Sequence, residues 1–230
     1  MTGEPQKIVD LSMPISERVP VYPGDPEPTF ERAVVINGAP FNVMRLDIGS
    51  HVATHCDAPY HFFPDGARID ELPLERFVGR PVIVDARGHG PRQPVTWDDL
   101  EPYTSQLGRA RMLLINTGWT SKRDEPGWLD DGLWMEHPYL EADACERAIE
   151  LGIRTIGIDA MNPDETRIHD EENREGFPVH DIVLGANGVL VENLVNLERI
   201  DFDDPLVCLF PLRVTDGDGA PTRAVALQLP

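Results

Sequence analysis

Cysteine, basic charge and long apolar runs are all scarce in this chain of 230 residues. There are only 3 cysteines, an odd number without a C-x-x-C pair, which argues against a disulfide framework and fits a reducing compartment. No apolar run approaches the length that spans a bilayer, and residues 1–10 have no apolar core behind a basic region. These absences predict a soluble protein that works in the cytoplasm.

Acidic residues outnumber basic ones. Lys and Arg total 20 against 40 Asp and Glu, so the formal charge is −20 at pH 7. A mean field of this sign opposes binding to nucleic acid or to an anionic membrane, and the basic residues form no cluster that would create a local exception. We therefore expect neither nucleic acid nor a membrane as a partner.

Common catalytic signatures are missing as well. The sequence has no G-x-S-x-G elbow, and it has no G-x-G-x-x-G opening or P-loop, so a nucleotide cofactor is not expected. A chain of this length can bury enough surface to fold without a metal. Any metal is therefore expected to be functional rather than structural.

What the chain does contain is a dense group of imidazoles. The stretch from His51 to His61 reads His-Val-Ala-Thr-His-Cys-Asp-Ala-Pro-Tyr-His. Its histidines and Asp57 have the same parity, so in an extended segment they point to one face, and Pro59 argues against an interior helix. Neutral imidazoles and ionised carboxylates are ligands of Zn²⁺, Mn²⁺ and Fe²⁺. The stretch predicts a catalytic metal centre, and the alternative is a polar loop with ordinary hydrogen bonds.

Other polar residues can be sorted by their surroundings. Cys56 has the opposite parity and is interpreted as a small buried residue. Glu192 interrupts the apolar run 188–195, where a carboxylate is costly to bury unless it is paired or bound to metal; the alternative is a strand-end Glu that reaches solvent. His180 precedes a short apolar segment. The remaining histidines are interpreted as surface residues, with His169 also able to face an active site: His89, His137 and His169.

Short runs rich in Val, Ile and Leu, bounded by Pro and Gly, predict most of the secondary structure. Apolar residues at a helical period predict a helix within 139–151, which Gly152 ends. The turn-like residues 215–221 predict a final antiparallel hairpin between 205–214 and 222–229. The other strands are expected at 8–13, 29–36, 41–48, 82–85, 111–116, 153–158 and 188–191. We predict one mixed α/β domain over residues 1–230, dominated by sheet.

The segment 119–138 is a predicted loop that holds three of the 4 tryptophans: Trp119, Trp128 and Trp134. Aromatic residues on a long loop often line a pocket or an interface. Packing of the loop against its own domain is the alternative, and Trp119 is kept as a candidate substrate contact.

Residues 49–63 resemble the His-x-Gly-Thr-His-x-Asp-x-Pro-x-His motif of the bacterial kynurenine formamidase and cyclase superfamily. Further landmarks follow in the family's order: Tyr-Pro-Gly-Asp-Pro at 22–26, Gly-Ile-Asp at 157–159, His180, and Glu-Asn-Leu at 192–194. The resemblance implies an α/β fold, a single domain with a twisted, partly barrel-like mixed β-sheet flanked by helices. It also implies a small-molecule substrate and homo-oligomers, either dimers or tetramers.

The resemblance further implies two divalent metals, typically zinc, with manganese in the isatin hydrolase branch. By position, His51, His55 and Asp57 match the ligands of the first metal. Asp57 can also bridge to a second metal, for which His180 and Glu192 match the remaining ligands.

Two divalent ions that share a carboxylate would lower the pKa of bound water and polarise a substrate carbonyl. This chemistry predicts hydrolysis of a small amide, lactam, lactone or ester. His61 matches the family's catalytic histidine, and such positioned proton transfer contributes roughly 10² to 10⁴-fold in rate. Two alternatives stay open: a polyketide-type cyclase that uses the polarised carbonyl, and a metal-stabilised small-molecule-binding protein without catalysis.

The chain departs from the family at several positions. Ala53 replaces a Gly in the first motif, and Ala160 and Asn162 replace the hydroxyl residues of an Asp-Thr-x-Ser-x-Asp element. The segment 163–179 is longer and more charged than expected. A substrate other than N-formylkynurenine is therefore at least as well supported. The candidate substrate contacts are Tyr22, Phe62, Trp119, Asn162 and His169.

Overall fold

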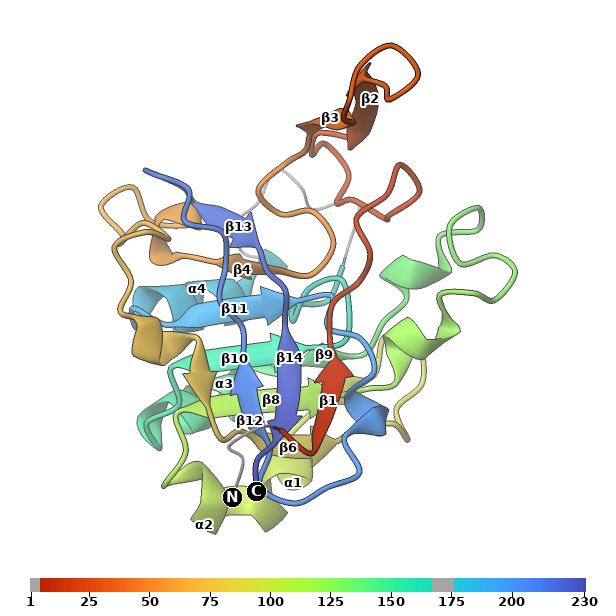
Figure 1. Ribbon diagram of the computed structural model, residues 1–230. Coiled ribbons are helices and arrows are strands. Elements are labelled where there is room, and N and C mark those ends of the chain that lie inside the picture. The colour runs from red at the N-terminus through yellow and green to blue at the C-terminus, as the bar shows by residue number, and fades with distance from the viewer. Residues whose placement is uncertain (1–4, 167–175) are drawn as a thin grey trace.

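A mixed sheet of six strands forms the centre of the computed structural model, which describes residues 5–166 and 176–230 (Figure 1). In spatial order the strands are β13 (Gly219–Pro221), β4 (His55–Asp57), β11 (Val189–Glu192), β10 (Thr155–Ile158), β8 (Met112–Asn116) and β6 (Val82–Asp85). The last four run parallel, whereas β4 is antiparallel to both of its neighbours. The predicted mixed α/β fold is confirmed.

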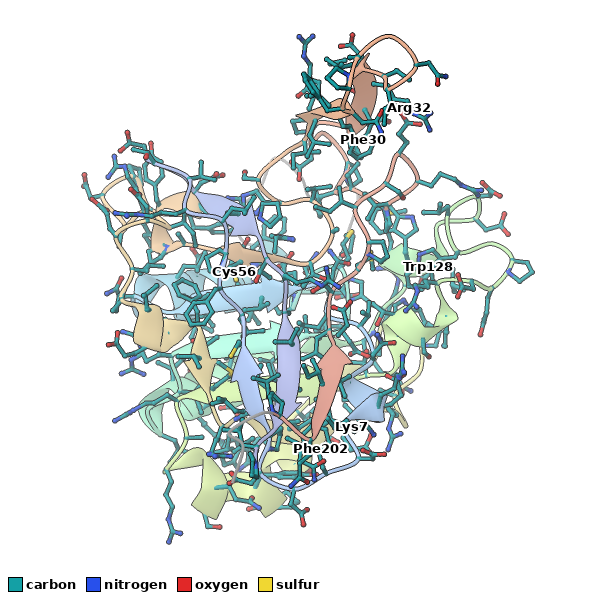
Figure 2. The ribbon with its side chains drawn as sticks, in the orientation of Figure 1. Lys7, Phe30, Arg32, Cys56, Trp128 and Phe202 are labelled. Carbon is teal, nitrogen blue, oxygen red and sulfur yellow. The ribbon has the colours of Figure 1, made fainter. Side chains whose placement is uncertain are left out.

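A second sheet, of four antiparallel strands, covers one face of the central sheet (Figure 1). Its strands, in spatial order, are β1 (Lys7–Asp10), β14 (Val225–Gln228), β12 (Leu206–Cys208) and β5 (Val78–Gly79). An apolar core lies between the two sheets, and Cys56 is fully buried in it, as its parity in β4 predicts (Figure 2). Cys56 therefore faces away from its polar neighbours on the same strand.

Helices cover the opposite face of the central sheet. They are α1 (Trp97–Leu100), α2 (Thr104–Leu107), α3 (Ala142–Glu150) and α4 (Pro178–Gly185). Strand β8 shows why both layers form, because Leu113 and Ile115 pack on the helix side while Met112 and Leu114 pack on the side of the second sheet. A strand buried on both faces has a continuous apolar sequence, as β8 does.

Shorter elements complete the chain. Strands β7 (Pro94–Val95) and β9 (Tyr139–Leu140) pair in parallel. The predicted helix over 139–151 is therefore shorter than expected, since its first two residues belong to β9. No helix in the described part of the chain has the length and apolarity to cross a membrane. The 3₁₀ helices are η1 (Pro59–His61), η2 (Leu74–Arg76), η3 (Glu101–Tyr103), η4 (Trp119–Lys122), η5 (Leu133–Met135) and η7 (Leu197–Arg199).

Strands β2 (Thr29–Val34) and β3 (Val43–Asp47) form a two-stranded arm that projects from the body (Figures 1 and 2). Every residue of β3 is exposed. The arm displays large apolar side chains, among them Phe41 at 55% exposure and Met44 at 56%. An isolated hairpin is marginally stable in water, so this β2–β3 arm carries apolar surface that the rest of the described chain does not cover.

The carboxyl-terminal hairpin forms only in part. Strands β12 and β14 pair as predicted, with Leu206 opposite Leu227. The predicted turn over 215–221 is confirmed only at its start, since 215–216 form a turn but Gly219–Pro221 forms β13 and pairs with β4 in the central sheet. This crossing between the two sheets brings Asp218 next to the histidine-rich stretch.

Candidate metal and active site

Strand β4 carries two of the predicted metal ligands. His55 and Asp57 are its first and last residues, so they share a face. On the neighbouring strand β11, Glu192 lies directly opposite His55, which places its side chain on the same face. The alternative in which Glu192 reaches solvent is wrong, because this residue is only 6% exposed.

The rest of the histidine-rich stretch is not extended, so the predicted single extended segment is wrong. Strand β4 is only 3 residues long. His51 precedes it in a turn where Ala53 has a φ of 55°, and His61 ends the 3₁₀ helix that Pro59 begins. A positive φ favours glycine, which is the residue that the family motif has at position 53. The polar side chains converge because the chain turns at both ends of β4.

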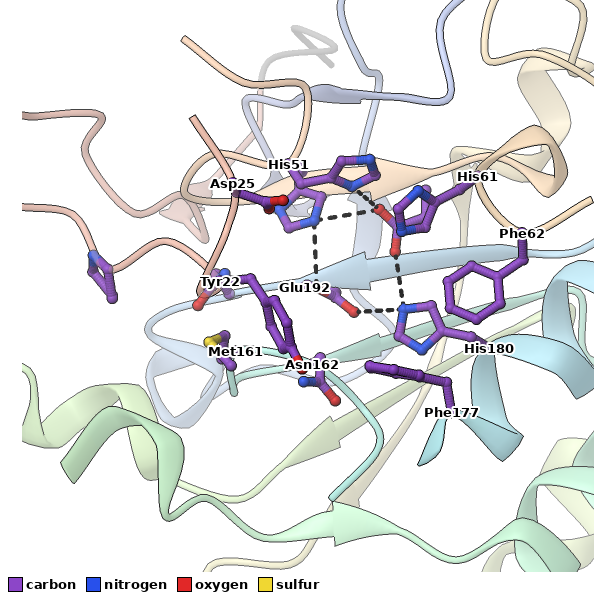
Figure 3. Close-up of a pocket in the computed structure, with 14 residues that line it drawn as sticks. Tyr22, Asp25, His51, His61, Phe62, Met161, Asn162, Phe177, His180 and Glu192 are labelled. Carbon is purple, nitrogen blue, oxygen red and sulfur yellow. Dashed lines mark hydrogen bonds and ion pairs between the residues drawn. The ribbon is translucent and has the colours of Figure 1, made fainter. Parts of the chain in front are cut away.

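The imidazoles and carboxylates meet in one compact cluster (Figure 3). His55 Nε2 lies 3.3 Å from Asp57 Oδ1 and 3.3 Å from Glu192 Oε2. His180, from α4, places its Nε2 3.3 Å from Glu192 Oε1 and 3.7 Å from Asp57 Oδ2. His51 Nδ1 lies 2.7 Å from Asp57 Oδ1. Residues from two distant parts of the sequence are thus side by side, with Asp57 between them.

Further hydrogen bonds fix the orientation of the imidazoles. His55 Nδ1 donates to the Ala53 carbonyl oxygen at 2.8 Å, and His180 Nδ1 donates to Asp164 Oδ2 at 2.6 Å. Asp164 also accepts hydrogen bonds from the backbone N–H groups of Val179 and His180 at the start of α4. The two Nδ1 hydrogen bonds leave Nε2 of His55 and of His180 as the ring nitrogen that faces the cluster and can bind a metal.

Asp218 joins the site although the sequence did not single it out. Its Oδ2 lies 2.9 Å from His51 Nε2 and 3.5 Å from His61 Nδ1. The next residue must be small, because a Cβ on Gly219 would lie 2.8 Å from His51 Cε1. The only sequence signal was the alternation of Asp and Gly over 216–219, which we interpreted as part of a turn. Asp218 therefore links His51 to His61.

The neighbouring carboxylates raise the pKa values of the buried imidazoles. Burial alone would lower the pKa of His51, but Asp57 and Asp218 raise it to about 9. Burial opposes the charged form of His180 too, yet its hydrogen bond to Asp164 raises the pKa to about 10. Without a metal, both rings therefore hold a proton at neutral pH.

The pKa values of the carboxylates shift in the opposite direction, below their usual values. Burial favours protonation of Asp57, but His55 and His51 hold its pKa well below the usual value. Burial and the neighbouring Asp57 oppose the charge of Glu192, and its contacts with His180 and His55 outweigh them, so its pKa is lowered. The cluster therefore alternates positive imidazoles with negative carboxylates.

The donor set fits divalent metal ions. Asp57 Oδ2 and Glu192 Oε1 are buried and accept no hydrogen bond from the described residues, which is costly for carboxylate oxygens unless a cation satisfies them. The ligand atoms of His51, His61 and Asp218 lie within 4.8 Å of one another, and so do those of each of two groups that share Asp57. These groups are His51–His55–Asp57 and Asp57–His180–Glu192. Imidazole and carboxylate donors suit Zn²⁺, Mn²⁺ or Fe²⁺, so each group could hold one ion with Asp57 shared.

A pocket of about 230 Å³ opens onto the cluster. Of the predicted substrate contacts, Tyr22, Phe62 and Asn162 line it, and Phe177 lines it as well (Figure 3). The Phe62 ring stacks on His180 with the centroids 4.7 Å apart, and Phe177 meets the same imidazole edge-on at 5.7 Å. The walls of the pocket are aromatic, and its floor is the polar cluster.

The tryptophan-rich loop packs against its own domain. Trp119 is only 1% exposed and forms a buried group with Trp128, Trp134 and Met161. Of these four residues only Met161 lines the pocket. Trp119 thus lies behind the pocket wall rather than on it, and the predicted contact His169 lies outside the described residues.

Two further polar residues belong to the pocket or support its wall. His137 was interpreted as a surface residue, and Asp25 was not singled out. His137 is buried, not exposed as predicted, and its Nε2 lies 2.8 Å from Thr166 Oγ1. The same hydroxyl accepts a hydrogen bond from Asn162 Nδ2 at 3.0 Å, so His137 supports the pocket wall indirectly. Asp25 lines the pocket, and burial raises the pKa of its carboxyl group. Its only signal was its place in the Tyr-Pro-Gly-Asp element.

The chain is similar in sequence to enzymes of one family. A model of the Cyclase family, described as Putative cyclase, matches residues 9–165. A kynurenine formamidase from Paracidovorax citrulli is 32% identical over 227 residues, which cover 96% of this chain and 96% of that protein. The similarity therefore extends along nearly the whole of both chains.

Solved structures have the same fold. Isatin hydrolase A from Labrenzia aggregata, bound to benzyl benzoate, matches with a TM-score of 0.82 at 23% identity, over 96% of this chain and 93% of that chain. A potential metal-dependent hydrolase with cyclase activity matches with a TM-score of 0.72 at 25% identity, over 96% and 98% of the two chains. The mixed sheet and its covering layers are thus shared with these proteins.

Proposed function

This chain belongs to the Cyclase family, and on that basis we propose that it is a metal-dependent hydrolase that cleaves the carbon–nitrogen bond of a small amide. The observation that carries the proposal is a pair of buried carboxylate oxygens, Asp57 Oδ2 and Glu192 Oε1, that lie beside His180 Nε2 and accept no hydrogen bond within residues 5–166 and 176–230. They form the floor of an aromatic pocket. Such a site is built to hold cations next to a bound carbonyl compound.

We propose that two divalent ions bind, with zinc favoured and manganese as the alternative. His51 and His55 would hold the first ion, His180 and Glu192 would hold the second, and Asp57 could contribute to both. The hydrogen bond between His51 Nε2 and Asp218 supports this assignment, because it leaves Nδ1 on the side of Asp57. The hydrogen bond from His180 Nδ1 to Asp164 supports the assignment of His180 to the second ion, because it holds the imidazole in place.

Divalent ions in this site would polarise a carbonyl group and lower the pKa of a bound water. The protein's own contribution is the handling of protons. When His61 Nδ1–H is directed to Asp218, Nε2 is the nitrogen that takes a proton from the attacking water and returns it to the departing nitrogen. Asp218 keeps the ring in the required tautomer, and its contact with His51 ties the proton-transfer residue to a metal ligand.

The pocket favours a small, flat substrate. Its volume of about 230 Å³ is below the roughly 300 Å³ at which pockets for drug-sized ligands begin. Tyr22, Phe62 and Phe177 present aromatic rings toward it, and aromatic faces bind planar rings well. We therefore propose an aryl formamide or a cyclic aryl amide as the substrate class.

The test is a substrate panel with the protein purified in its native metal state. N-formylkynurenine, isatin, a cyclic imide and a lactone of similar size are compared by product formation. We expect hydrolysis of at least one amide, loss of that activity after chelation, and its return when zinc or manganese is added. Metal-loaded protein that hydrolyses only the lactone, or that leaves the whole panel intact, contradicts amide hydrolysis.

We also propose that the protein assembles as a homo-oligomer through the β2–β3 arm. The exposed apolar side chains of the arm support this, since a lone hairpin is marginal in water. We expect Met44→Glu to reduce the mass measured by light scattering, whereas Leu74→Glu, at an exposed leucine outside the arm, leaves it unchanged. A monomeric parent protein contradicts the proposal.

We propose that the protein acts in a reducing compartment such as the cytoplasm. The three cysteines support this, because none of them forms a disulfide.

A further inference from the structure

Five arginines line a single cleft of about 510 Å³. They come from three separate parts of the chain, 76–80, 109–111 and 154, so no run of basic residues in the sequence reveals them. The expectation that the basic residues form no cluster is therefore wrong, because the fold assembles one. This arginine cleft is lined by Arg76, Arg80, Arg109, Arg111 and Arg154.

The arginine cleft lies at the opposite edge of the central sheet from the histidine cluster. Met112 and Thr155, the first residues of β8 and β10, line the cleft. Glu192, the last residue of the parallel strand β11, belongs to the histidine cluster. Since β8, β10 and β11 run in the same direction, one site lies where they start and the other where they end (Figure 1).

Arginines outnumber acidic residues on the lining of the cleft, where Glu75 supplies a carboxylate beside the five guanidinium groups. Arg80 forms an ion pair with Asp204 at 2.8 Å. The other four arginines form no ion pair with any carboxylate among residues 5–166 and 176–230. Burial lowers the pKa of Arg76, and the nearby Arg154 and Arg111 lower it further, as expected for like charges held together. This arrangement is unusual in a chain with twice as many acidic as basic residues.

Backbone contacts hold two of these guanidinium groups in place. Arg154 Nη1 donates to the carbonyl oxygens of Ile149 and Ile153 at 2.9 and 2.6 Å. Arg111 Nη1 donates to the carbonyl oxygen of Gly152 at 3.0 Å, and a Cβ at that glycine would lie 2.5 Å from the same nitrogen. A guanidinium that is already positioned loses less side-chain entropy when it binds a ligand.

We propose that the arginine cleft is a binding site for a small phosphate-bearing anion. Guanidinium groups bind phosphate and carboxylate oxygens through paired N–H donors. Even with Glu75 on its lining, the cleft keeps an excess of positive charge, which calls for a ligand with more than one negative charge, and a tetrahedral phosphate accepts donors from several directions at once. A volume of about 510 Å³ leaves room for an organic group beside the phosphate, so a nucleoside monophosphate or a sugar phosphate fits the site. The proposal does not depend on the hydrolase activity.

The test measures binding of adenosine 5′-monophosphate, adenosine and inorganic phosphate to the metal-loaded protein by isothermal titration calorimetry at low ionic strength. We expect saturable binding of the monophosphate and of phosphate, with none for adenosine. The double variant Arg76→Gln/Arg154→Gln should weaken monophosphate binding by about tenfold or more, because charge-assisted hydrogen bonds are lost. The matched control Arg199→Gln/Arg213→Gln removes the same charge at exposed positions outside the cleft and should leave binding within about twofold.

A second double variant tests the cleft independently, because Arg154 bonds to two backbone carbonyls and its loss could prevent folding. Arg109→Gln/Arg111→Gln removes two charges from the same cleft and should also weaken binding by about tenfold. The proposal is overturned if the monophosphate does not bind, if adenosine binds equally well, or if the control pair weakens binding as much as the cleft variants. Hydrolysis of the amide panel is measured on the same samples, so failure of one proposal is separable from failure of the other.

Discussion

The two edges of the central sheet hold charges in opposite ways. In the histidine cluster, positive and negative groups alternate, and His55 and His180 each lie within 3.3 Å of Glu192. In the arginine cleft, four guanidinium groups form no ion pair with a carboxylate of the described chain, and they outnumber Glu75, which also lines the cleft. The histidine cluster can exchange its protons for metal cations, whereas the arginine cleft keeps an excess of positive charge that an anion from outside can neutralise.

Burial separates the two regions as well. The side chains of His55, Asp57, His180 and Glu192 are 1 to 7% exposed. Arg80, Arg109 and Arg111 are exposed, and Arg76 and Arg154 are partly buried. Salt screens exposed charges far more than buried ones. Added salt should therefore weaken anion binding in the arginine cleft and leave the ion pairs of the histidine cluster nearly unchanged.

The largest expected effect comes from Asp57→Ala. The variant removes the one carboxylate that both halves of the cluster share, so two sets of imidazoles lose their common counter-charge. We expect loss of bound metal, beyond the roughly 10- to 100-fold loss of affinity that follows changes around metal ligands, together with loss of turnover. Metal analysis by mass spectrometry and the amide assay check this, with Asp98→Ala at an exposed position as the control. Full metal content in Asp57→Ala would remove Asp57 from the ligand set.

His61→Ala should separate metal binding from catalysis. His61 contacts Asp218 and stacks near His51 but is not required by either three-donor group that shares Asp57. We expect normal metal content and a turnover lower by roughly 10² to 10⁴-fold, the usual contribution of a positioned proton-transfer group. Near-normal turnover in the fully metallated variant would exclude His61 from the reaction.

Asp218→Asn should have a smaller effect on both properties. The amide cannot balance the charge of His51, but it can still hydrogen-bond to both His51 and His61. We expect turnover to fall by about 10- to 100-fold and its dependence on pH to change, as for other residues that orient a metal ligand. A pure folding defect would lower the active fraction without changing the pH profile, and that outcome would contradict a positioning role.

Metal affinity should rise with pH. In the metal-free protein His51 has a pKa of about 9 and His180 of about 10, both above the ordinary value of 6.5, so metal must displace protons at neutral pH. Each displaced proton changes affinity by about tenfold per pH unit. The same raised pKa values stabilise the metal-free fold below pH 6.5, and this stabilisation is lost as pH rises through 9 to 10. Calorimetric titration with zinc at several pH values, in buffers of different ionisation enthalpy, counts the protons, and a count of zero contradicts the assignment.

The smallest expected effect sharpens the contrast between the two edges. Arg76→Gln/Arg154→Gln should leave the turnover of the amide substrate within about twofold, because the change lies at the other end of the parallel strands and salt screens charges that reach the solvent. A tenfold loss of turnover with unchanged metal content would show that the two edges are coupled.

Much of the fold could be predicted from local patterns. Alternating or continuous apolar runs placed β6, β8, β10 and β11 within a residue or two of their observed limits. The helix was predicted too long, because Tyr139 and Leu140 pair with β7 instead. The terminal hairpin was only half right, because β13 pairs with β4. Pairing partners in the other sheet are not encoded in a local pattern, so periodicity alone could not reveal them.

The sequence by itself determined the chemistry available near β4, since the residue types and the two-residue period put His55 and Asp57 on one face. It did not determine which other residues surround these two side chains. Only the tertiary structure brought Asp218 against His51 and gathered arginines from three segments into one cleft. The physical reason is that electrostatic contacts depend on distance in space, and the fold brings residues more than a hundred positions apart within about 3 Å of one another.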